Sequence, residues 1–174
     1  VLSHVRLTHI FSGPDLALGG ETLDVDTGLT QLSAVANRFW SIGPPNRVFL
    51  YGGVGTSFDS APLPTNQFLL GTPFRLGAYD TGELRGAHYY VATGGYLRRV
   101  GLPDFVGGAV FAGGWLENGD AFDEWKRAGW KVNGGVGLVM DTIVGPVVVA
   151  GSWSFDGRWR TYLGIGRMFR APTT

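Results

Sequence analysis

The sequence predicts an all-β fold, an antiparallel transmembrane β-barrel with eight strands per chain, on three observations. Segments with period-two alternation recur at about the length, roughly 9–11 residues, that a strand needs to cross a bilayer. The faces opposite the apolar rows carry mostly Gly, Ser, Asn and Thr, whereas a solvent-facing sheet would present charges. The connections between strands alternate between short and long, as in bacterial barrels.

The eight predicted strands follow one another with no long helical stretch between them. Only a single turn around residues 123–127 has helical character. An even number of strands is what single-chain bacterial barrels require. In chain order, the predicted strands are residues 1–11, 27–40, 47–58, 87–99, 104–117, 129–140, 145–155 and 159–169.

The alternation is clearest towards the end of the chain. In the strand 145–155, one face carries Val147, Val149, Gly151, Trp153 and Phe155, and the opposite face carries Val148, Ala150, Ser152 and Ser154. Aromatic residues also gather near predicted strand ends, as in interfacial girdles; they are Trp40, Phe58, Trp115, Trp130, Trp159 and Phe169. A water-soluble up-and-down barrel is the main alternative fold, but its outward face should be polar.

The connections give an independent test of this organisation. The second, fourth and sixth links, residues 41–46, 100–103 and 141–144, are short and rich in turn-forming residues. The first, third and fifth links, residues 12–26, 59–86 and 118–128, are long, and only the last outer link, 156–158, is short. This organisation predicts one barrel domain over residues 1–169, with a long outer loop at 59–86 and a short tail at 170–174.

Composition excludes several classes of protein. Lys+Arg and Asp+Glu number 14 each in 174 residues, which argues against a broad nucleic-acid-binding surface. The lack of cysteine removes disulfides, thiolate nucleophiles and cysteine-ligated zinc. No run of about 18 apolar residues predicts a transmembrane helix. The first ten residues lack the pattern of a secretory signal, so we expect a mature form or a fragment.

Four sequence pieces between residues 68 and 169 together resemble a known family. They are GTPFRLGAYDTGELRG at 71–86, GGAVFAGGWLENGDAF at 107–122, GGVGLVMDTIVGPVVVAGSWS at 134–154 and YLGIGRMF at 162–169. The chain resembles the carboxy-terminal half of the bacterial surface antigen superfamily, the outer-membrane barrels of BamA, TamA and the two-partner-secretion transporters. It is most similar to the barrel of the patatin-like type V autotransporters. The first 60 residues match mainly in the layout of their strands.

The resemblance implies that these strands are the last eight of a sixteen-strand barrel. In that family a long sixth outer loop is followed by five strands, and here the loop 59–86 is also followed by five. Half of such a barrel leaves two strand edges unpaired, which a lipid environment does not tolerate. The eight strands must therefore close on themselves, pair with a second copy, or belong to something longer.

Members of this family fold the sixth loop into the barrel. There, an arginine of an Arg-Gly-aromatic motif meets an acidic or aromatic motif on a strand. Here the loop reads RLGAY at 75–79, so the arginine is displaced from the glycine. The resemblance implies that Arg75, Gly77 and Tyr79 form the tip of the inserted loop. Its candidate partners are Trp115 and Glu117 on the strand motif GGWLE.

The resemblance also implies the partners of the chain. Phe169 resembles the terminal aromatic residue that the barrel-assembly machinery reads, although a short tail follows it. We further expect contact with the lipid bilayer and lipopolysaccharide of the bacterial outer membrane. We expect two copies of the chain to associate through their first and last strands. We do not expect the chain to bind nucleic acid.

The residues form no catalytic constellation. The chain has no Gly-x-Ser-x-Gly elbow. His4 and His9 are five residues apart, so on a strand they point to opposite faces and do not share a metal. The chain contains the residue types of a hydrolase site, as in outer-membrane lipid A deacylases, at Ser3, His4 and Glu21. Their spacing does not favour such a site. We therefore expect no enzyme activity, no cofactor and no metal site.

The first functional hypothesis is a non-enzymatic outer-membrane barrel for protein translocation or insertion, acting through a seam or a pore shared by two copies. Eight strands enclose only their own side chains, whereas sixteen enclose an aqueous lumen. A closed eight-strand barrel that serves as a structural anchor or adhesion module is the second hypothesis. A lipid-modifying enzyme of that barrel size is the third.

Overall fold

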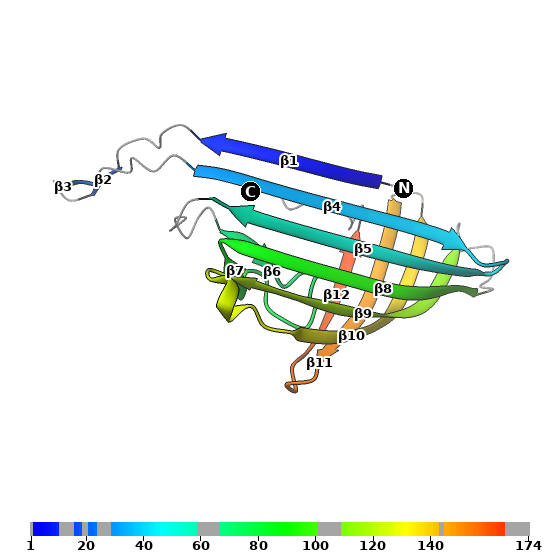
Figure 1. Ribbon diagram of the computed structural model, residues 1–174. Coiled ribbons are helices and arrows are strands. Elements are labelled where there is room, and N and C mark those ends of the chain that lie inside the picture. The colour runs from blue at the N-terminus through cyan, green and yellow to red at the C-terminus, as the bar shows by residue number, and fades with distance from the viewer. Residues whose placement is uncertain are drawn as a thin grey trace.

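The computed structural model describes residues 2–10, 16–18, 21–23, 29–58, 67–100, 109–142 and 145–165. Their dominant feature is one antiparallel sheet of eight long strands, which curves strongly into a trough (Figure 1). None of these residues lies in an α-helix, and within these ranges no helix is long and apolar enough to cross a membrane. The predicted all-β class with eight antiparallel strands is therefore confirmed.

Each of the eight long strands corresponds to one predicted from the sequence. In sheet order they are β1 (Leu2–Ile10), β4 (Leu29–Ser41), β5 (Asn46–Ser57), β8 (His88–Val100), β9 (Val110–Phe122), β10 (Lys131–Thr142), β11 (Gly145–Ser154) and β12 (Trp159–Ile165). Every neighbouring pair is antiparallel. Within the described residues, β1 and β12 are the two edges and do not pair with each other, so this sheet is open.

Short elements lie inside the links that the sequence predicts as loops. A hairpin of β2 (Leu16–Leu18) and β3 (Glu21–Leu23) lies within the first link. A hairpin of β6 (Phe68–Leu70) and β7 (Leu84–Gly86) lies within the long loop 59–86. The expected helical turn is a short 3-10 helix at Trp125–Arg127.

Strand β9 differs most from its predicted range, because it ends at residue 122 and not at 117. Residues 118–122, NGDAF, contain Asn, Gly and Asp, which favour turns. They nevertheless continue the ladder with β8. Gly119 suits this close pairing, since a Cβ there would lie 2.6 Å from the carbonyl oxygen of Tyr90. Long-range pairing thus overrides the local turn preference.

The outer face of the sheet exposes large apolar side chains, whereas the concave face buries polar side chains beside apolar ones. On the outer face, Val54, Leu116 and Leu163 are 56%, 63% and 68% exposed. The buried polar residues of the sheet include Gln31, Ser57, Thr93, Glu117, Asn133, Ser152 and Ser154. An antiparallel sheet with its outer face in water would instead expose mostly polar side chains there.

The aromatic residues predicted near strand ends do not all face outward. Phe58, Trp130 and Trp159 are exposed and Trp40 is half-buried, but Trp115 is buried on the concave face. The inclusion of Trp115 among the outward girdle residues was therefore wrong. The reason is its position two residues before Glu117, which places both side chains on the same side of β9.

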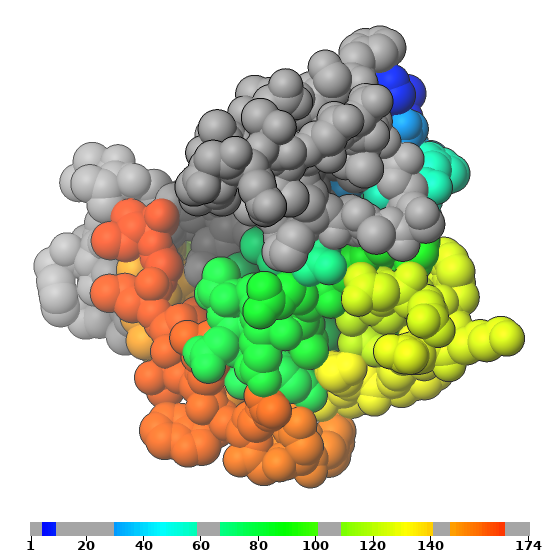
Figure 2. Space-filling model, turned by 90° about the vertical axis from the view of Figure 1, so that its left-hand side faces the viewer, coloured from blue at the N-terminus to red at the C-terminus, as the bar shows by residue number. Residues whose placement is uncertain are grey.

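Residues 71–83, between β6 and β7, lie against the concave face and are called the covering segment below. Figure 2 shows green atoms of this part of the chain between the orange strands and the yellow strands of the sheet. Leu76 packs in a buried cluster with Tyr51 and Tyr89, whereas Phe74 packs in a second cluster and lies 4.6 Å from Trp115 between ring centroids. The covering segment therefore supplies part of the core of the molecule.

Candidate functional site

A carboxylate buried in the concave face is the centre of the candidate site. Glu117 projects from β9 and its side chain is fully buried. Its Oε2 accepts a hydrogen bond of 2.7 Å from the backbone N–H of Gly77, and its Oε1 accepts one of 3.1 Å from Trp115 Nε1. Among the described residues, no cationic side chain lies within ion-pair distance of it. Neutral N–H donors therefore hold this carboxyl group.

Two glycines leave room for the indole that binds the carboxylate. Gly95 on β8 and Gly135 on β10 lie opposite Trp115 in the register of the sheet. A Cβ on Gly135 would lie 2.4 Å from the indole nitrogen, and a Cβ on Gly95 would lie 2.8 Å from the Cβ of Trp115. Glycine in a strand permits such a close approach. These two positions therefore allow the indole N–H to reach Glu117.

The covering segment presents the N–H of Gly77 through an unusual backbone conformation. Phe74 and Leu76 have positive φ angles of 64° and 62°, which cost a residue with a Cβ about 1–2 kcal/mol each. Both side chains are buried, and burial of a large apolar side chain contributes about 1.5–3 kcal/mol. Packing thus offsets the backbone cost. Residues held in such conformations cluster at functional sites.

Gly77 itself lies close to the far side of the trough. A Cβ at this position would lie 3.0 Å from the Oγ of Ser152 on β11 and 3.4 Å from a ring carbon of Tyr162 on β12. The absence of a side chain therefore lets the backbone approach the sheet on both sides.

Two neighbouring strands also bind the backbone of the covering segment. On β8, the Oγ1 of Thr93 donates to the carbonyl of Phe74 at 2.7 Å. On β10, the amide of Asn133 is best satisfied when its oxygen accepts from the N–H of Ala78 at 3.1 Å and its nitrogen donates to Val132 O at 3.1 Å. With the carboxylate on β9, three adjacent strands each contribute one buried polar side chain to residues 74–78. The site can therefore hold a loop by its main chain.

Arg75 is buried but does not pair with Glu117. Its Nη2 lies 3.5 Å from the carbonyl oxygen of Leu69, and its guanidinium carbon lies 5.9 Å from the ring centroid of Tyr89. The structure therefore brings Gly77, and not the arginine, to the predicted partner Glu117. The physical reason is spacing, since the arginine stands two positions before the glycine in RLGAY.

Tyr79, the third predicted residue of the loop tip, is held at the opposite end by the turn after β11 and by the start of β12. Its hydroxyl donates to Asp156 Oδ2 at 3.1 Å, and its carbonyl oxygen accepts a 2.7 Å hydrogen bond from Arg160. The guanidinium of Arg158 lies 4.9 Å from the centroid of the Tyr79 ring and forms an ion pair with Glu83. Charged residues of this turn thus fasten the end of the covering segment.

These contacts shift the proton equilibria of the groups involved. Burial, followed by the hydrogen bond to Asp156, raises the pKa of Tyr79 to about 12. The hydrogen bond from Ser154 holds the pKa of Asp156 below its ordinary value. The backbone N–H of Asp80, followed by the guanidinium of Arg158, lowers the pKa of Glu83. Both carboxylates are therefore favoured in their charged form.

Models of known protein families show no match to this chain, and a search of curated proteins found no match either. The resemblance to the bacterial surface antigen superfamily therefore stays a prediction. Function has to be inferred from the geometry of the sheet and its covering segment.

The remaining predicted residues are not placed in the site. Phe169 lies outside the described residues, and so do the side chains of Ser3, His4 and Glu21. The hydrolase alternative is therefore not placed either. Within the part of the chain that the structure describes, no three His, Cys, Asp or Glu residues are grouped as a metal site would require.

Several residues of the site were not predicted. Asn133 carried a signal, because the alternation of its strand puts it on the polar face. Thr93 carried the weaker signal of lying on one face with other inward residues of β8. No sequence signal pointed to Asp156 and Arg160, because their role depends on where the distant residue Tyr79 comes to lie.

Proposed function

We propose that the chain forms half of an outer-membrane β-barrel that moves or inserts other polypeptides, with two copies paired edge to edge. The observation that carries this proposal is the exposed apolar outer face of the sheet, together with polar side chains buried on the concave face. Apolar side chains such as Val54 and Leu116 are exposed, while Glu117 and Asn133 are fully buried on the concave face. Acyl chains would solvate the first set, and a lumen would hold the second.

Strand length supports a membrane setting. Strands β4, β8 and β9 have 13 residues each, and β5 and β10 have 12 each. A transmembrane strand needs about 9–11 residues. Each of these strands is therefore long enough to cross the hydrocarbon core.

The open edges support pairing with a second copy. The backbone N–H and C=O groups of an unpaired edge have no water to bind in lipid, and each costs several kcal/mol. If β1 of one protomer pairs with β12 of its partner at both junctions, all edges are satisfied. The result is a barrel of sixteen strands, twice the eight in one chain. A barrel of that size has an aqueous lumen.

The covering segment suits a gate in such a lumen. It binds the concave face through its main chain at residues 74–78, and through the contacts of Tyr79 at its end. We propose that its displacement opens the path for a polypeptide. In this proposal the protein performs no catalytic step and resides in the bacterial outer membrane. Its other partners are then lipopolysaccharide and the barrel-assembly machinery.

The test uses the absence of native cysteine in the chain. A double variant, Val5→Cys with Leu163→Cys, places one thiol on each edge strand at positions that are 69% and 68% exposed. The protein is reconstituted into liposomes, floated on a density gradient and treated with a short bifunctional thiol reagent. Each single variant is the control, because β1 would not adjoin another β1, nor β12 another β12.

We expect floated protein and a covalent dimer from the double variant alone. A cross-link within one chain would instead establish a closed eight-strand barrel, the form expected of a structural anchor. Protein that remains in the aqueous fraction would refute the membrane proposal. Planar-bilayer conductance of the uncross-linked protein then distinguishes a pore from a plugged barrel.

A further inference from the structure

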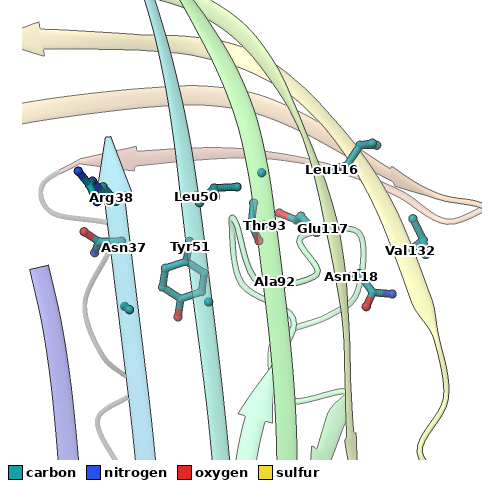
Figure 3. Close-up of a pocket in the computed structure, with 13 residues that line it drawn as sticks. Asn37, Arg38, Leu50, Tyr51, Ala92, Thr93, Leu116, Glu117, Asn118 and Val132 are labelled. Atoms are coloured by element: carbon teal, nitrogen blue, oxygen red, sulfur yellow. The ribbon is translucent and has the colours of Figure 1, made fainter. Parts of the chain in front are cut away.

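The outer face of the sheet contains a hollow of about 690 Å³ over β4, β5, β8, β9 and β10 (Figure 3). Its volume lies within the range of about 300–1,000 Å³ that is typical of ligand sites. Most outward positions that line it are very small or apolar, and the polar ones are Arg38 and Asn118. The small ones are Ala36, Gly52, Ala92 and Gly94, and the larger apolar ones are Leu50, Leu116 and Val132.

The register of the sheet explains why the surface is hollowed at this place. Ala36, Gly52 and Ala92 stand side by side on β4, β5 and β8. The next outward row towards the loop end carries the larger pair Val54 and Tyr90. Three adjacent strands thus lack a large side chain in one row, and on β5 and β8 larger side chains border that row.

The space above this row is open in the structure. A Cβ on Gly52 would meet only the carbonyl oxygen of Val91, at 3.9 Å, among the described residues. On the turn side, Leu50 leans over Gly94, where a Cβ would lie 3.2 Å from Leu50 Cδ2. The hollow therefore has an apolar wall at one side and room above its floor.

A cation stands at one end of the hollow. Arg38 is exposed on β4, next to Leu50 in the register, and its guanidinium carbon lies 5.1 Å from the ring centroid of Trp40. Among the described residues, no carboxylate lies within ion-pair distance of Arg38. Arg38 and Trp40 are close to the end of the strand, where arginine and tryptophan meet lipid headgroups in membrane proteins.

We propose that this hollow binds one phospholipid, with an acyl chain along Ala36, Gly52 and Ala92 and the phosphate on Arg38. The apolar floor matches an acyl chain, and the guanidinium matches an anionic phosphodiester. This inference rests on the proposed function, because the hollow meets lipid only if the outer face does.

The experiment measures retention of phosphatidylglycerol by the full chain in detergent, using native mass spectrometry. Two variants probe the hollow. Arg38→Gln removes the cation, and Ala92→Leu fills the floor. Their matched controls are Arg98→Gln and Ala112→Leu, which alter outward positions of the same face that do not line the hollow.

We expect the wild type and both controls to retain one phosphatidylglycerol. We expect Arg38→Gln and Ala92→Leu each to weaken retention roughly tenfold, as the loss of one charge-assisted contact or of the acyl site predicts. Equal retention of phosphatidylglycerol by all five proteins would refute the proposal. A second copy of the chain bound at the hollow in place of lipid would refute it as well.

Flotation of the same proteins with liposomes separates this inference from the proposed function. If all of them float and none loses lipid, the hollow is not a lipid site while the barrel proposal stands. If the wild type does not float, both proposals fail.

Discussion

The backbone N–H of Gly77 donates to Glu117 Oε2 over 2.7 Å, between residues that are 40 positions apart in the chain. This bond fixes the covering segment at the middle of the curved sheet. Its acceptor is a buried side chain, while its donor is main chain. The contact therefore depends on the path of the backbone at residue 77 more than on any side chain of the covering segment.

Loss of the carboxylate should release the covering segment. Glu117→Ala leaves the N–H groups of Gly77 and Trp115 buried without an acceptor, at about 1–3 kcal/mol each. We expect the free energy of unfolding to fall by about 2–5 kcal/mol. Denaturant unfolding in detergent measures this, and mass spectrometry follows trypsin cleavage after the buried Arg75.

An exposed carboxylate supplies the control for that variant. Glu124→Ala changes a side chain that is 61% exposed, so we expect little change in stability or cleavage. If Glu117→Ala is cleaved after Arg75 no faster than Glu124→Ala, Glu117 does not hold the covering segment.

A side chain at residue 77 should push the covering segment away from the sheet. In Gly77→Ala, the new Cβ would lie 3.0 Å from Ser152 Oγ, and Gly77→Val adds further bulk. We expect losses of about 1 and about 1–3 kcal/mol in the free energy of unfolding. In the control Gly151→Ala, the nearest atom is 3.8 Å away, so its effect should stay within about 0.5 kcal/mol. Equal effects at the two glycines would show that residue 77 is not tightly fitted.

The indole N–H of Trp115 should stabilise the fold through its hydrogen bond to Glu117. Trp115→Phe keeps an aromatic ring against Phe74 but removes the N–H that binds the carboxylate. We expect a loss of about 2–4 kcal/mol, which combines the hydrogen bond with the smaller ring. A double-mutant cycle with Glu117→Ala measures the coupling, which should exceed about 0.5 kcal/mol. Additive losses would mean that the indole acts only by packing; the exposed Trp125 provides the control Trp125→Phe.

Acid should loosen the end of the covering segment near Tyr79. The pKa values of Glu83 and Asp156 are lower in the folded protein than their ordinary values. Both groups therefore stabilise the fold above those ordinary values, and this contribution is lost as the pH falls through the lowered ones. The protection of residues 76–83 against hydrogen exchange, relative to the intrinsic exchange rate at each pH, should be unchanged from neutral pH down to about 5 and smaller below about 4. An Arg158→Gln variant should lose part of this acid dependence, and an identical profile would contradict the assignment.

Alkali should also loosen the end of the covering segment near Tyr79. The pKa of Tyr79 is raised to about 12, so its neutral form is favoured in the folded protein. Its contribution is fully present below pH about 10 and is lost as the pH rises through about 12. Ultraviolet absorbance of the Tyr79→Phe variant, subtracted from that of the wild type, should show this phenol titrating near pH 12. Titration near pH 10 would mean that the hydroxyl is neither buried nor bound to Asp156.

Much of the fold could be predicted because its determinants are local. Period-two alternation located all eight strands, and in β11 it separated Ser152 and Ser154 from the apolar row. Boundaries were less predictable. Residues 118–122 have turn composition, and only their pairing with β8 makes them a strand.

The candidate site was also predictable in one part and not in another. The resemblance pointed to the loop at 75–79 and to the motif that contains Trp115 and Glu117, and the structure places these two parts in contact. It did not indicate that a backbone N–H would take the position expected for Arg75. Two positive φ angles in the covering segment direct that N–H, and only packing stabilises such angles in residues other than glycine.

The strands and the alternation of their two faces follow from the residue pattern, because side chains alternate with a fixed period of two in any β-strand. The curvature of the sheet and the segment that covers its concave face depend instead on contacts between distant parts of the chain. Contacts such as Tyr79 with Asp156, which are 77 positions apart, depend on that curvature. Local preferences do not specify them, since each such contact forms only when the whole sheet is in place.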